Sequence, residues 1–147
     1  MSEFLTSDKT LIDNPVYIKI RDALYLLIDS GFTVKYAGRC VDASRMVMAI
    51  LAQHDIKSHM QECCALLTQE KDKIKQLYAI GYYHVVDPGE IATHYVTVTE
   101  TEPPFFIDIS IEKYLMDGQK IVLERAENEM ILGNYSYQHF KLTYIRK

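Results

Sequence analysis

The sequence predicts an α+β fold in which N-terminal helices pack on an antiparallel sheet. In two N-terminal segments, residues 15–30 and 40–54, apolar residues recur at three- and four-residue steps, which is typical of helices with one buried face. The chain that follows contains short runs of β-branched and aromatic residues separated by turn residues, which are typical of strands. Because helices precede strands instead of alternating with them, the pattern favours the α+β class.

The length and composition indicate one soluble domain, residues 1–147. The 147 residues are enough to bury a core, and 48% hydrophobic with 24% charged residues is close to the globular average. A net charge of −4 without a basic cluster argues against a nucleic-acid partner. No apolar run approaches the ~20 residues of a membrane span, and the first residues do not resemble a signal sequence. We therefore expect no membrane association and a cytoplasmic location.

The first helix is expected from Pro15 to Ser30. Asn14 can cap its first turn, Pro15 suits the first helical position, and Gly31 suits the residue after the last turn. The residues expected on its core face are Val16, Ile20, Ala23, Leu24, Leu27 and Ile28.

The remaining chain is expected to form the sheet. The expected strands cover residues 62–68, 77–86, 92–99, 105–111, 120–125 and 137–145. Residues 56–60 are interpreted as an extended link, the mixed-charge run 69–75 as a solvated loop or hairpin tip, and 87–90 as a turn. Residues 111–116 are interpreted as a helical turn. The aromatic residues of the last segment, expected on a half-buried face, are Tyr135, Tyr137, Phe140 and Tyr144.

The candidate nucleophile is Cys40, at the start of the second expected helix, which runs to His54. Gly38 lies just before it, and a helix-forming run follows immediately. The unpaired N–H groups and positive dipole end of a helix stabilise a nearby thiolate. Asp42, in the first turn, is interpreted as a surface or capping residue. The residues expected on the core side of this helix are Val41, Ser44, Met48 and Leu51.

A candidate base and its orienting residue lie on two later strands. His94 opens one strand-like run and Asp108 lies within the next. The intervening turn could bring the two side by side, although strand alternation alone does not require them to share a sheet face. If they meet, Asp108 accepts a hydrogen bond from one imidazole nitrogen and the other nitrogen can deprotonate Cys40. His84 with Asp87 is a rival pair.

These residues resemble the transglutaminase-like branch of the papain-like cysteine enzymes, and arylamine N-acetyltransferases share the same Cys, His, Asp order. The matching segments are residues 38–45, 94–98 and 106–110. The resemblance implies a papain-like core with a triad of Cys40, His94 and Asp108, and acyl transfer or amide hydrolysis through a thioacyl-enzyme. The substrate would be a peptide, a protein or a small acyl or amide compound, and no cofactor is implied.

The chain also departs from this family. It contains no Trp, which such enzymes often place near the oxyanion site, and no Gln precedes Cys40 within 31–39. The expected oxyanion donors are the backbone N–H of Cys40 and, second, Tyr36. The alternatives are a non-catalytic member of the same fold that binds a partner as a regulator or inhibitor, and a buried Cys40 with an accidental resemblance.

The other cysteines predict neither a disulfide framework nor a metal site. Cys63 and Cys64 are adjacent, and neighbouring cysteines rarely pair because the bridge strains the peptide between them. An odd number of cysteines without a framework fits a reducing compartment. His54 and His59 lie nearby, but the spacing matches no structural zinc pattern, so we expect no metal. The oligomeric state is not defined by these patterns.

Overall fold

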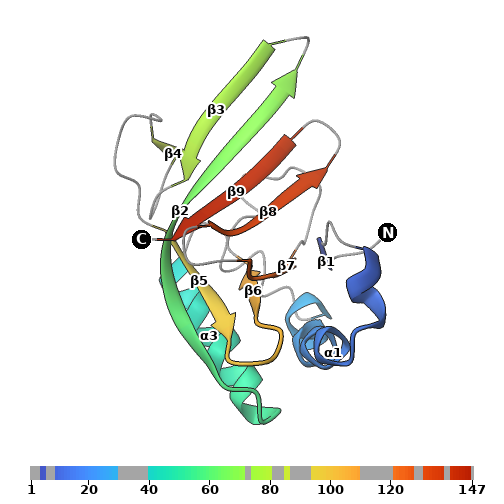
Figure 1. The fold of residues 1–147 in the computed structure, drawn as a ribbon. Helices are drawn as coiled ribbons and strands as arrows, with labels where there is room; N and C mark the ends of the chain where they lie inside the picture. Colours follow the sequence, from blue (N-terminus) through green and yellow to red (C-terminus); the bar gives the residue numbers. More distant parts are fainter. Residues whose placement is uncertain are drawn as a thin grey trace.

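The computed structural model describes residues 4–5, 9–29, 40–71, 74–80, 85–86, 94–109, 121–127, 131–137 and 140–146. In these residues, helices pack with a mainly antiparallel sheet, which confirms the α+β class (Figure 1). The helical elements are the 3-10 helix η1 (Lys9–Asp13), α1 (Pro15–Asp29) and α3 (Cys40–Gln53). The strands are β1 (Phe4–Leu5), β2 (Ser58–Lys71), β3 (Ile74–Ile80), β4 (Val85–Val86), β5 (His94–Thr99), β6 (Phe105–Asp108), β7 (Ile121–Arg125), β8 (Ile131–Tyr137) and β9 (Phe140–Arg146).

Helix α1 begins where the sequence predicts. The Asn14 side-chain oxygen Oδ1 accepts hydrogen bonds from the backbone N–H groups of Val16 and Tyr17, at 2.9 and 3.2 Å, and so caps the first turn. The described part of the helix ends at Asp29, and the expected stop at Gly31 lies outside the described residues. Its buried residues are Tyr17, Ile20, Ala23, Leu24 and Leu27, so four of the six predicted core residues are confirmed and Tyr17 is added. Val16 is only half-buried, and the side chain of Ile28 lies outside the described part of the structure.

Helix α3 also confirms the predicted segment, but its core face is rotated. The predicted Ser44 and Leu51 are buried, whereas Val41 and Met48 are only half-buried. The buried residues are Cys40, Ala43, Ser44, Val47, Ile50 and Leu51, a spacing that places Val41 and Met48 at the sides of the buried face. None of the helices in the described segments is long and apolar enough to cross a membrane.

The long strand β2 pairs with β5 near its start and with β9 further along. Its first half, Ser58–Cys63, pairs with β5, and residues 63–69 pair with β9 along the same strand. Apart from the β8–β9 hairpin, the order of the strands is β1-β7-β6-β5-β2-β3-β4. Among the strands that the structure describes, β1 and β7 form the one parallel pair. Figure 1 shows the β2–β3 and β8–β9 hairpins extending side by side from the helix-bearing part. The first residue of β5 and the last residue of β9 therefore both pair with Cys63.

Three predictions for the sheet were wrong in their extent. The expected strand 77–86 is two strands, since β3 ends at Ile80 and β4 (Val85–Val86) pairs antiparallel with it. The expected link 56–60 is largely strand, because β2 already begins at Ser58 opposite Thr99. The expected strand 137–145 is confirmed as β9 from Phe140 onward, but its first residue, Tyr137, is the end of β8, which pairs with β9. Strand β8 was not predicted because Gly133 and Asn134 are typical of turns. The register of β8 with β9 also shifts beside Gly133, as at a β-bulge.

The hairpin interpretation of the mixed-charge run is confirmed, since Lys71 pairs with Ile74. Residues 87–90 and 111–116 lie outside the described residues.

The register between β5 and β6 shows which of their residues lie on each face of the sheet. Thr97 lies opposite Ile107, and both face the helices: Ile107 belongs to the core cluster formed with α1 and α3, and the Thr97 hydroxyl donates to the Ser44 carbonyl at 3.2 Å. Val98 lies opposite Phe106, so the even-numbered residues share the other face. His94 and Asp108 are both on this second face, which settles the point that strand alternation alone left open.

Candidate functional site

Cys40 is the first residue of α3, as the sequence predicts. This position puts its side chain at the amino end of a helix of 14 residues, where the first backbone N–H groups lack helical partners. The residue is only 2% exposed, so the thiol is covered in this structure. Gly38 and the expected oxyanion donor Tyr36 lie outside the described residues.

The structure brings His94 and Asp108 together. The imidazole nitrogen Nε2 of His94 lies 2.8 Å from Oδ2 of Asp108, and both residues are 2% exposed. Because an ionised carboxylate only accepts hydrogen bonds, this contact assigns a proton to Nε2. The other ring nitrogen, Nδ1, is buried and makes no hydrogen bond of standard geometry within the described part of the chain. The pair thus has the geometry expected of a base and its orienting residue.

Cys40 and His94 interact electrostatically. Burial lowers the pKa of His94 and is the largest single influence, but it is opposed by the charge and hydrogen bond of Asp108, and by a hydrogen bond and charge interaction with Cys40. Together these interactions raise the pKa of His94 from 6.5 to about 10. Since Nε2 faces Asp108, Nδ1 is the nitrogen available to Cys40. At neutral pH His94 is therefore an imidazolium between the carboxylate of Asp108 and the sulfur of Cys40.

Tyr144 is a fourth member of the cluster. Its hydroxyl donates a hydrogen bond to the same Oδ2 atom of Asp108, at 2.8 Å. Its ring lies 4.9 Å from that of Phe106 and 6.2 Å from that of His94, measured between centroids. Burial, followed by the charge and hydrogen bond of Asp108, raises the pKa of Tyr144 well above 10, so the hydroxyl keeps its proton.

Sequence reasoning missed the role of Tyr144. The prediction of a half-buried face is wrong for this residue, which is fully buried. The alternation of residues along the last strand could predict that Tyr144 faces the buried side of the sheet. Its contact partners, however, depend on the register between β2 and β9, in which Tyr144 lies opposite Ala65. Two further buried side chains, Cys63 and Glu124, act on Tyr144 through charge, and no local signal indicated either of them.

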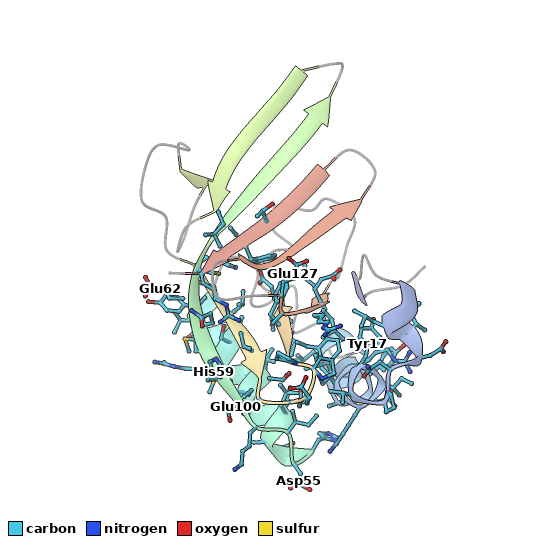
Figure 2. All side chains as sticks on the ribbon, in the orientation of Figure 1. Tyr17, Asp55, His59, Glu62, Glu100 and Glu127 are labelled. Carbon is cyan, nitrogen blue, oxygen red and sulfur yellow. The ribbon has the colours of Figure 1, made fainter. Side chains whose placement is uncertain are left out.

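Among the described residues, His59 does not join this cluster. The rival pair His84 and Asp87 lies outside the described residues. His59 is exposed, with Nδ1 at 3.7 Å from a carboxylate oxygen of Glu100, and both labelled side chains lie at the surface in Figure 2. Across the described ranges, no three His, Cys, Asp or Glu side chains gather as metal ligands. Asp42 lies in the first turn of α3 and is half-buried.

Comparison with known proteins adds no relatives: no family model matches the chain, and neither the curated proteins nor the solved structures give a match.

Proposed function

We propose that this protein is a cysteine-dependent enzyme that forms a thioacyl intermediate on Cys40, with His94 and Asp108 completing a triad in a transglutaminase-like core. The observation that carries the proposal is the buried contact of 2.8 Å between Nε2 of His94 and Asp108, which leaves Nδ1 for Cys40. The order of elements supports it, since the cysteine begins a helix, the histidine begins a strand and the aspartate ends the adjacent strand.

The first chemical step is acylation of the cysteine. The thiolate sulfur of Cys40 attacks the carbonyl carbon of an amide or thioester, forming a C–S bond, and the bond to the leaving amine or thiol breaks. The proton on Nδ1 of His94 passes to that leaving group, which departs neutral. Asp108 stays ionised and keeps the imidazole in orientation through Nε2.

The second step returns the enzyme to its starting state. Water or an amine attacks the thioacyl carbon and gives its proton to Nδ1, which the first step left without one. The C–S bond breaks with its electron pair on sulfur, so the thiolate and the imidazolium form again. Water as acceptor makes the enzyme a protease, amidase or deamidase, whereas an amine makes it an acyltransferase.

The developing oxyanion requires hydrogen-bond donors. The backbone N–H of Cys40 is the first proposed donor, because it lies at the amino end of α3. Tyr36 is the second proposed donor. None of these steps needs a cofactor.

A second candidate function is a non-catalytic binding module. The covered state of Cys40 favours it, because a substrate reaches a thiol that is 2% exposed only after the covering residues move. A pocket of about 580 Å³ lies at the other end of α3, lined by residues that include Met48, Asp55 and Glu100. Figure 2 shows Asp55 and Glu100 at that end of the molecule. This candidate predicts no covalent adduct on Cys40.

Acyl trapping tests the proposed enzyme directly. The protein is mixed with p-nitrophenyl acetate, quenched at short times and analysed by peptide mass spectrometry. We expect one acetyl group on Cys40, and its formation should slow by ~100-fold or more in His94→Ala, since positioned acid–base groups contribute factors of that order. The control is His59→Ala, which removes an exposed histidine. Acetylation spread over lysines, with Cys40 unmodified, contradicts the enzyme and favours the binding module.

A further inference from the structure

We infer that Tyr144 is a positioning residue of this site: its hydroxyl fixes the buried carboxylate of Asp108 in the orientation that His94 requires. This inference rests on the proposed function, and it adds to the triad a residue that the family resemblance does not supply.

The argument begins with the oxygen that the two donors share. Nε2 of His94 and the hydroxyl of Tyr144 both lie 2.8 Å from Oδ2 of Asp108. A carboxylate held by one donor can rotate about its side-chain bonds, whereas two donors from different strands define where that oxygen lies. Because the donors come from β5 and β9, which both pair with β2, the position of Oδ2 is tied to the frame of the sheet.

The ring of Tyr144 is itself held in place. It is fully buried and packs against Phe106, which is also fully buried, with 4.9 Å between ring centroids. Phe106 lies on the same strand as Asp108 and on the same face, two residues away. The donor and the carboxylate are therefore positioned by one packed cluster.

The second donor also stabilises the negative charge of Asp108. A buried carboxylate has lost its hydration and depends on hydrogen bonds from the protein to stay ionised. His94 from β5 and Tyr144 from β9 supply such bonds. The groups that act on Tyr144 by charge are Asp108 on β6, Cys63 on β2 and Glu124 on β7, and negative charge on any of them disfavours its ionisation. Tyr144 thus remains a donor over the whole pH range in which the site would work.

The test compares two tyrosine variants that each lose one buried hydroxyl. Tyr144→Phe keeps the ring that packs on Phe106 and removes only the donor. Tyr17→Phe is the matched control, since Tyr17 is 3% exposed and its ring packs against Phe105, on the helix-facing side of the sheet. The readout is the titration of the His94 ring nitrogens by ¹⁵N NMR, assigned with His94→Gln.

We expect Tyr144→Phe to lower the titration midpoint of His94 by about one to two pH units, because a carboxylate that is free to rotate weakens both its hydrogen bond to Nε2 and its attraction for the imidazolium. Tyr17→Phe should leave the midpoint within the error of the wild type. An unchanged or raised midpoint in Tyr144→Phe would overturn the inference, because it would mean that Asp108 holds His94 equally well without the hydroxyl. This readout needs no substrate, so its failure is separate from a failure of acyl trapping on wild-type Cys40.

Discussion

Replacing Asp108 by alanine is expected to destabilise the protein by about 3–5 kcal/mol and to remove the upward shift in the pKa of His94. The substitution leaves two buried donors, Nε2 of His94 and the Tyr144 hydroxyl, without their shared acceptor. Burial is the largest influence on His94 and acts to lower its pKa, so without the carboxylate we expect the pKa to fall from about 10 to 6.5 or below. His94 would then be largely neutral at pH 7.5 and would no longer provide a proton for the leaving group.

Urea unfolding at pH 7 measures the loss of stability, and ¹⁵N NMR measures the His94 titration. Glu124→Gln is the matched control, because it removes another buried carboxylate that is not among the groups acting on His94. The control should leave the His94 titration unchanged, whatever its effect on stability. A loss below ~1 kcal/mol in Asp108→Ala, with His94 still titrating near 10, would contradict the buried ion pair.

The stability of a Cys40→Ser variant is expected to fall as pH rises from 7 to 9. With Cys40 in place, the pKa of His94 is about 10 in the folded state, above the ordinary value of 6.5 that it takes on unfolding. Asp108, the larger of the influences that raise this pKa, is kept in the variant. Because the folded state binds the His94 proton more tightly, the protonated ring stabilises the fold. This stabilisation is fully present below pH 6.5 and is lost as the pH rises through the folded-state pKa. Between the two values the folded state binds one more proton, so the free energy of unfolding should decrease by about 1.4 kcal/mol per pH unit. Serine removes the titration of the thiol from the comparison.

The matched variant is Cys40→Ser combined with His94→Gln. Titrations elsewhere in the chain are common to both proteins, so the difference between their slopes isolates His94. Chemical denaturation at half-unit pH intervals gives both slopes. Parallel curves for the two proteins would show that His94 has the same pKa folded and unfolded, which is incompatible with the contact to Asp108.

Local sequence signals predicted the elements that carry the site. Asn14 and Pro15 mark the start of α1, and the apolar period after Cys40 marks α3, because caps and helical periodicity depend on residues close in sequence. His94 and Asp108 were correctly placed on neighbouring strands because the turn between them is short.

What the sequence could not show are the long-range contacts. That His94 and Asp108 share a face depends on the β5–β6 register, and the approach of Tyr144 depends on how β9 joins β2 beside Cys63. Register is set by packing across the whole sheet, which one strand does not encode. The buried state of Cys40 likewise follows from tertiary packing, since a helix start alone is compatible with an exposed thiol.

The pairing of Cys40 with His94 is tested most directly by alkylation with iodoacetamide, read residue by residue by mass spectrometry at pH 6 and pH 8 in the wild type and His94→Ala. A thiolate stabilised by the imidazolium predicts that wild-type Cys40 reacts readily at pH 6, far faster than the fully buried Cys63, and that His94→Ala slows its reaction at pH 6 by at least ~10-fold while the protein stays folded. Equal rates in the two proteins at pH 6 would contradict the pair, and protection of Cys40 until the chain unfolds would contradict the proposed enzyme.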